Sequence, residues 1–146
     1  MGYFDLTGYE CRRRSTVGSF VVNLPEMMGA MATDPRNIVA VAEFSDGRYW
    51  QCRADEDSSI AMEVVSNLNI SGDASALSDL DEESLRAMGF MEPSRVSNPN
   101  WRVETSGVGD LGRLVLLTTS AVYDVLRECP QNAVDVRTWE FQSSRG

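Results

Sequence analysis

Apolar residues recur every three or four positions between residues 15 and 31, which is the spacing of one buried face of a helix. Three methionines belong to this stripe: Met27, Met28 and Met31. Pro25 either kinks the segment or stands in the first turn of a helix capped by Asn23, where proline is tolerated. Methionine can adapt to flexible ligands, although such a stripe is more often ordinary core.

Two further stretches carry helical signals. The acidic run that begins at Asp81 predicts a short capped helix that ends at Gly89. Apolar residues then recur at helical spacing over residues 114–126, until Cys129 and Pro130 stop the pattern. The sequence therefore predicts a third helix near its end, longer than the one that stops at Gly89.

Five segments have the length and composition of β-strands: residues 37–44, 48–53, 59–70, 101–106 and 134–141. The Asp46-Gly47 pair between the first two favours a tight hairpin. In the third strand an apolar face (Ile60, Met62 and Val64) alternates with a mixed one (Ala61, Glu63 and Val65). Such a mixed face is expected of a surface that a partner sometimes covers.

The order of these elements indicates the fold class. Runs of strands replace the strict alternation of strand and helix that a parallel sheet requires, so we expect an α+β domain with antiparallel strands in residues 15–146. Residues 1–14 show no sustained period and end in three arginines. We expect a partly ordered arm there, with an added edge strand as the alternative.

Composition and charge narrow the possible functions. The chain has 146 residues and a net charge of −9, which repels phosphate backbones, so we expect no nucleic-acid partner. All 13 basic residues are arginines, and there is no histidine. The chain therefore lacks an imidazole base, an imidazole metal ligand and a lysine nucleophile.

The cysteines and the absence of long apolar runs bear on location. Cys11, Cys52 and Cys129 are isolated, which indicates neither a disulfide framework nor a zinc site. We interpret Cys52 as a small buried hydrophobe. No apolar run is as long as a membrane span, and the start lacks the pattern of a secretory signal. We expect a cytoplasmic protein that makes no membrane contact.

The sequence GVGDLG at residues 107–112 matches the dinucleotide-binding fingerprint G-x-G-x-x-G. That fingerprint needs a buried parallel strand before it and further strand-helix units after it. Because the preceding WRVETS is polar and little chain follows, we interpret the glycines as a flexible start of the last helix, with Asp110 as its cap or first-turn acid. The acidic runs at residues 55–57 and 79–83 lack the spacing of a calcium loop. We expect no cofactor and no metal.

Three segments occur together in an order that resembles a known family: GRYWQCR at 47–53, AMEVVSN at 61–67, and LRAMGF followed by SNPNW at 85–101. They are similar to the bacterial peptide-binding chaperones related to YbjN and to type III secretion chaperones. The chain departs from the family pattern at Trp50, Cys52 and Arg102. The resemblance implies a secretion-chaperone-like α+β fold, a twisted antiparallel sheet of about five strands with helices packed on one side.

The function that the resemblance implies is binding of peptide or protein clients, without a cofactor and without catalysis. An immunity or regulatory protein that binds one folded partner is the alternative, followed by an enzyme that uses carboxylates. A homodimer is compatible with the sequence. We expect contact residues at Met27, Met28, Met31, Tyr49, Trp50, Ala61, Glu63 and Val65. We expect structural roles for Asn67, Asn100 and Trp101.

Overall fold

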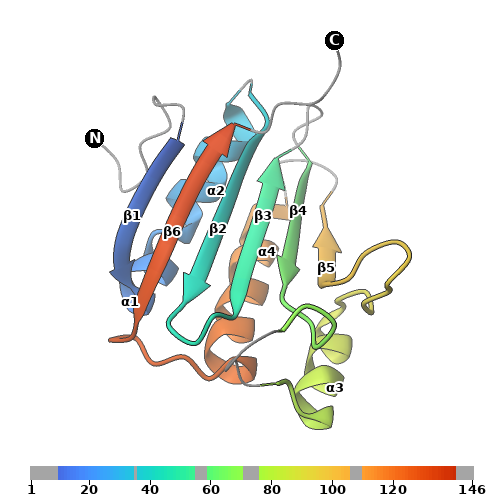
Figure 1. Ribbon diagram of the computed structural model, residues 1–146. Coiled ribbons are helices and arrows are strands. Elements are labelled where there is room, and N and C mark those ends of the chain that lie inside the picture. The colour runs from blue at the N-terminus through green and yellow to red at the C-terminus, as the bar shows by residue number, and fades with distance from the viewer. Residues whose placement is uncertain (1–9, 35, 55–58, 71–75, 106–109, 141–146) are drawn as a thin grey trace.

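Six strands form one antiparallel sheet in the computed structural model, which describes residues 10–34, 36–54, 59–70, 76–105 and 110–140. Their order across the sheet is β1-β6-β2-β3-β4-β5 (Figure 1). The strands are β1 (Glu10–Thr16), β2 (Ile38–Phe44), β3 (Tyr49–Ala54), β4 (Ile60–Val64), β5 (Trp101–Glu104) and β6 (Ala133–Glu140). The helices are α1 (Val17–Val22), α2 (Leu24–Thr33), α3 (Asp79–Met88), α4 (Leu111–Ser120) and the π-helical turn η2 (Ala121–Val125).

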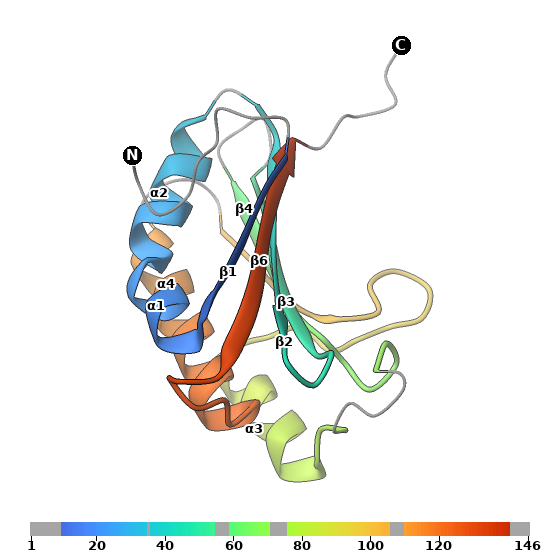
Figure 2. The same ribbon diagram turned by 60° about the vertical axis from the view of Figure 1, so that its left-hand side comes forward.

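The helices gather on one side of the sheet, as Figure 2 shows for α1, α2 and α4. α3 lies beyond one end of the strands and packs against η2. Alternate residues of β2, β3, β4, β5 and β6 point toward the helices and form the core, together with the buried side chains of α1, α2, α4 and η2. The expected α+β class and the antiparallel sheet with helices on one side are confirmed.

The sheet has one strand more than the five expected from the sequence. This additional strand is β1, which pairs with β6 at one edge of the sheet. Residues 10–14 belong to it, so the alternative of an added edge strand holds for this part of the N-terminal segment, while residues 1–9 lie outside the described residues. β6, the last strand of the chain, lies between β1 and β2. The two ends of the described chain therefore meet inside one sheet.

The first predicted helix is in fact two helices that meet at Asn23. α1 begins after Thr16, whose hydroxyl accepts a hydrogen bond from the Ser19 backbone N–H at 3.2 Å. Pro25 stands in the first turn of α2, where its missing N–H leaves no helical hydrogen bond unmade. The Asn23 side chain donates to the Ser19 carbonyl at 2.7 Å and makes no capping bond to α2.

α3 begins two residues before the position that the acidic run indicated. Ser78 is its N-cap, and its hydroxyl accepts from the backbone N–H of Asp81 at 3.1 Å, while the Asp81 carboxylate accepts from the Ser78 N–H at 3.0 Å. The helix ends at Gly89, whose φ of 100° is left-handed and therefore favours glycine. The predicted end of the helix is confirmed.

The strand before GVGDLG is β5, which pairs with β4 in antiparallel fashion at the other edge of the sheet. It is not the buried parallel strand that a dinucleotide site requires. Residues 106–109 lie outside the described residues, and so does the acidic run at 55–57. Asp110 is the N-cap of α4, although its side chain makes no capping hydrogen bond.

Candidate functional site

The sheet has a second face that none of the described helices covers (Figure 2). We call it the open face. Residues directly opposite one another in neighbouring antiparallel strands share a face, so the pairing registers identify its members. Members whose side chains the structure describes include Arg12, Arg14, Val39, Val41, Glu43, Tyr49, Gln51, Arg53, Ala61, Glu63, Arg102, Glu104, Asp135, Arg137 and Trp139.

A hollow of about 220 Å³ opens on this face above β2, β3 and β4. Ala61 explains where it lies, because its single methyl group stands between Arg53 and Glu104 in the row of side chains that crosses the strands. Val39 and Ala61 are only 9% and 5% exposed, since longer neighbours surround them. The lining residues are Val39, Gln51, Cys52, Arg53, Ala61, Glu63, Arg102 and Trp139.

Trp139 gives the hollow an aromatic wall. It stands opposite Val39 in the pairing of β6 with β2. The guanidinium of Arg137, from the same strand, lies over its ring at 6.0 Å from the centroid. This is the separation of a cation-π contact, so Arg137 places a positive charge next to the aromatic wall.

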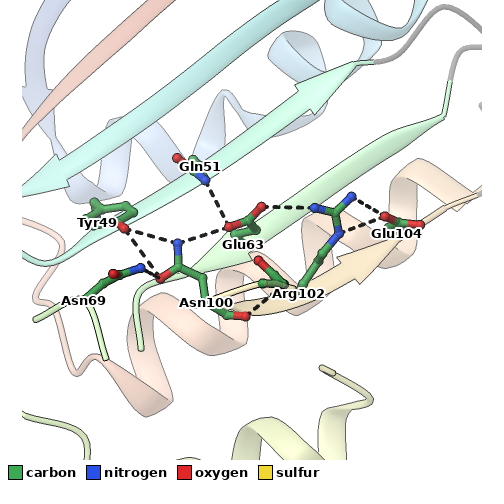
Figure 3. Close-up of polar contacts among 8 residues, drawn as sticks. Tyr49, Gln51, Glu63, Asn69, Asn100, Arg102 and Glu104 are labelled. Atoms are coloured by element: carbon green, nitrogen blue, oxygen red, sulfur yellow. Dashed lines mark hydrogen bonds and ion pairs between the residues drawn. The ribbon is translucent and has the colours of Figure 1, made fainter. Parts of the chain in front are cut away.

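The opposite wall is a network of polar side chains centred on Glu63 (Figure 3). Its carboxylate accepts hydrogen bonds from Gln51 Nε2 at 3.0 Å, Asn100 Nδ2 at 3.0 Å and Arg102 Nη1 at 3.3 Å. Arg102 also donates through Nε to Glu104 at 2.8 Å. Because hydrogen bonds to ionised groups are the strong ones, this wall is formed before any ligand arrives.

Asn100 joins the network to the loops beside it. Its amide nitrogen donates to Tyr49 Oη at 3.1 Å, and its amide oxygen accepts from Asn69 Nδ2 at 2.8 Å and from the Ser66 backbone N–H at 3.3 Å. The residue is 3% exposed. One buried amide therefore ties β3, the segment after β4 and the segment before β5 together.

Asn67 and Trp101 hold neighbouring parts of the same region. The Asn67 side chain donates to the carbonyl of Leu77 at 2.9 Å and accepts from the Leu77 backbone N–H at 2.7 Å. Trp101 is 1% exposed, with the Arg86 guanidinium 5.6 Å from its ring centroid. Both residues thus contact the protein's own chain near α3.

Four of the expected contact residues lie in the core. Met27, Met28 and Met31 are fully buried. Trp50 is fully buried as well, and its Nε1 donates to Thr118 Oγ1 at 3.1 Å. This burial corrects the expectation that the first helix and Trp50 offer a contact surface, because the apolar stripe of α2 and the even-numbered residues of β3 face each other across the core.

Two of the three residues expected on the mixed face of the third strand are on the open face. Ala61 is part of the floor of the hollow, Glu63 part of its wall, and Tyr49 contacts the same network through Asn100. Val65 is 1% exposed, because β4 ends at Val64 and the alternation of faces ends with it. This corrects the expected strand over 59–70 and the expected exposure of Val65.

Most of the side chains that surround the hollow were not among the contact residues expected from the sequence: Val39, Gln51, Arg53, Arg102 and Trp139. Gln51 and Arg53 could have been assigned by alternation from Tyr49. Trp139 could not, because its position depends on the pairing of β6 with β2, which are far apart in the chain.

The reactive groups of the described residues do not favour catalysis at this site. Cys52 is buried, which raises the pKa of its thiol above the ordinary value, and its Sγ lies 3.6 Å from Met31 Sδ on the helix side. Its expected role as a small buried hydrophobe is confirmed. Within the described ranges, no group of three or more potential ligands gathers to hold a metal ion. None of the described helices is long and apolar enough to cross a membrane.

Residues 18–138 match the family model described as "T3SS (YopN, CesT) and YbjN peptide-binding chaperone 3" (TY-Chap3). This span includes β2, β3, β4 and β5 in full and residues 133–138 of β6, and it includes the hollow apart from Trp139. No curated protein and no solved structure matches the chain.

Proposed function

The chain belongs to the TY-Chap3 family of peptide-binding chaperones, and on that premise we propose that it binds an extended segment of a client protein on the open face. One apolar side chain of the segment fills the hollow. The observation that carries the proposal is the hollow itself, with an apolar floor of Val39 and Ala61 on a sheet face that the described helices leave uncovered. The protein then holds its client without changing it chemically.

The polar wall suits a peptide because it is rigid and satisfied. Glu63 is held by three donors, so a ligand meets a pre-formed surface and spends little free energy on ordering it. Gln51 and Arg53 offer polar atoms beside the apolar floor, where an extended backbone exposes its carbonyls. Apolar floor and polar rim together are the usual composition of a ligand site.

The face is better suited to this role than the β5 edge. Met91 already exchanges two backbone hydrogen bonds with Arg102, at 2.8 and 3.3 Å. A client strand would have to displace them before it could add to the sheet there. Three free thiols, Cys11, Cys52 and Cys129, agree with a reducing compartment, and the cytoplasm remains the proposed location.

A binding measurement with a filled hollow tests the proposal. Peptides are selected from a random display library on the wild-type protein, and their affinities are measured by fluorescence anisotropy for wild type and Ala61→Leu. We expect Ala61→Leu to weaken binding about tenfold or more, because the added atoms occupy the space of the anchor. Ala87→Leu, the same change at an exposed position of α3, is the matched control and should bind as wild type does.

Trp139→Ala provides a second variant should Ala61→Leu fail to fold, since Trp139 is only partly buried. We expect it to weaken the same peptides by removing the aromatic wall. The proposal is wrong if the library yields no binder, or if both hollow variants that fold bind the selected peptides as tightly as wild type. If the protein instead captures a single folded partner, and Ala61→Leu binds that partner as tightly as wild type does, the immunity or regulatory alternative is favoured.

A further inference from the structure

We propose that the client segment is acidic next to its apolar anchor: it carries a carboxylate within two residues of the side chain that fills the hollow. This inference rests on the proposed function and names the chemical class of its ligand. It follows from how charge is distributed over the open face and around Trp139.

The open face is almost neutral, although the protein is strongly acidic. Among the described side chains it carries five arginines and four carboxylates, whereas the whole chain has a net charge of −9. The excess negative charge is therefore located elsewhere. An acidic segment is repelled by most of the molecule but not by this face, and such a difference in potential directs where a charged partner docks.

Two arginines stand directly opposite each other at the side of the hollow that Trp139 forms. Arg12 of β1 pairs in register with Arg137 of β6, on the open face. Like charges in this position destabilise a sheet unless a counter-charge is near. Arg12 has a partner in Asp135 at 3.7 Å, whereas Arg137 makes no ion pair with the described residues and lies over the Trp139 ring.

The carboxylates of the hollow are already engaged. Glu63 accepts from Gln51, Asn100 and Arg102, and Glu104 accepts from Arg102. A basic ligand would therefore have to compete with arginine and amide donors for these oxygens. Arg137, which lies over the ring of Trp139, takes no part in holding this polar wall.

The geometry of an extended peptide fits this arrangement. Side chains two residues apart lie on the same side of an extended chain, about 6.5–7 Å from each other. If the apolar anchor of the client packs against Trp139, the client side chain two residues away reaches the guanidinium of Arg137, which lies over the same ring. Arginine binds a carboxylate through two parallel hydrogen bonds, so the pair also fixes the orientation of the segment.

The experiment extends the peptide selection to charge-reversed proteins. On wild type we expect selected peptides to be enriched in Asp or Glu within two residues of an apolar residue. Replacement of that acid by its amide should weaken binding about tenfold or more, the range of one charge-assisted hydrogen bond. On Arg137→Glu we expect enrichment of Lys or Arg at the same distance. The fold should tolerate this change, because it places an opposite charge next to Arg12.

Arg113→Glu is the matched control, since it changes the net charge by the same amount at an exposed position of α4. It should leave the preference for acidic peptides unchanged. The inference is overturned if peptides that lose affinity on Ala61→Leu are basic or neutral, or if Arg113→Glu changes the preference as much as Arg137→Glu does. If no selected peptide loses affinity on Ala61→Leu or on Trp139→Ala, the proposed function is overturned, and this inference with it.

Discussion

Asn100→Asp replaces one atom in the centre of the polar wall and leaves the side-chain volume almost unchanged. The Asn100 nitrogen donates to Glu63 Oε1 at 3.0 Å and to Tyr49 Oη at 3.1 Å. The substitution puts a carboxylate oxygen in that place. A donor to Glu63 is lost, and two carboxylates then stand within hydrogen-bonding distance in a buried position.

The size of the effect follows from the proton that one carboxyl must take up to relieve the repulsion. Two unit charges 3 Å apart repel by about 5 kcal/mol at an effective dielectric constant of about 20. Protonating a carboxyl with an unfolded pKa of about 3.9 costs about 4 kcal/mol at pH 7 and about 1.5 kcal/mol at pH 5. The protein takes whichever is less costly, the charge repulsion or the protonation. We therefore expect the free energy of unfolding to fall by about 2–4 kcal/mol at pH 7 and by at most about 1.5 kcal/mol at pH 5.

The sign of the pH dependence is part of the prediction. The introduced carboxyl has a pKa that is raised in the folded state, so its destabilising effect is absent below the unfolded pKa and grows as the pH rises toward the folded one. Urea unfolding followed by tryptophan fluorescence at pH 5 and pH 7 measures it. Asn37→Asp, which adds the same charge outside the Glu63 network, is the control. A difference between Asn100→Asp and wild type below about 1 kcal/mol at pH 7, or one that does not change between the two pH values, would refute the reasoning.

Three further outcomes follow from the burial and pairing of single residues. Trp101→Ala should lower the free energy of unfolding, measured in urea, by about 3 kcal/mol or more, because the removed ring is 1% exposed. A variant that is as stable as wild type and has lost only peptide binding would contradict this prediction. Arg48→Ala should cost about 3–5 kcal/mol in the same assay, because it leaves the buried carboxylate of Glu128, 3.4 Å from Arg48 Nη2, without its guanidinium. Iodoacetamide at pH 8 should label the exposed Cys129 in the native protein, whereas Cys52, whose pKa is raised by burial, should react only in urea, and mass spectrometry would detect native labelling of Cys52 as the contrary result.

The sequence pattern predicted the individual helices and strands better than it predicted which strands lie next to each other in the sheet. Alternation and the Asp46-Gly47 turn predicted the hairpin of β2 and β3 because both signals act within a few residues. β1 was only an alternative, since its strand conformation depends on pairing with β6 more than a hundred residues later. A strand of three arginines has little apolar signal of its own.

The candidate site was predicted in part for the same reason. Ala61 and Glu63 were identified from the mixed face of their own strand. The methionines of α2 were assigned to a contact surface, although the period of an apolar stripe shows which residues share a face and not what covers that face. Here the sheet covers it. Trp139 could be found only after the sheet order was known.

Chemical-shift mapping is the most direct test of whether client segments bind on the open face. A library-selected peptide is titrated into the ¹⁵N-labelled protein, and the backbone amides with the largest shifts are assigned. We expect these amides to lie around the hollow, at Val39, Gln51, Arg53, Ala61 and Trp139. Shifts confined to α1, α2 or α4 on the other side of the sheet would contradict it.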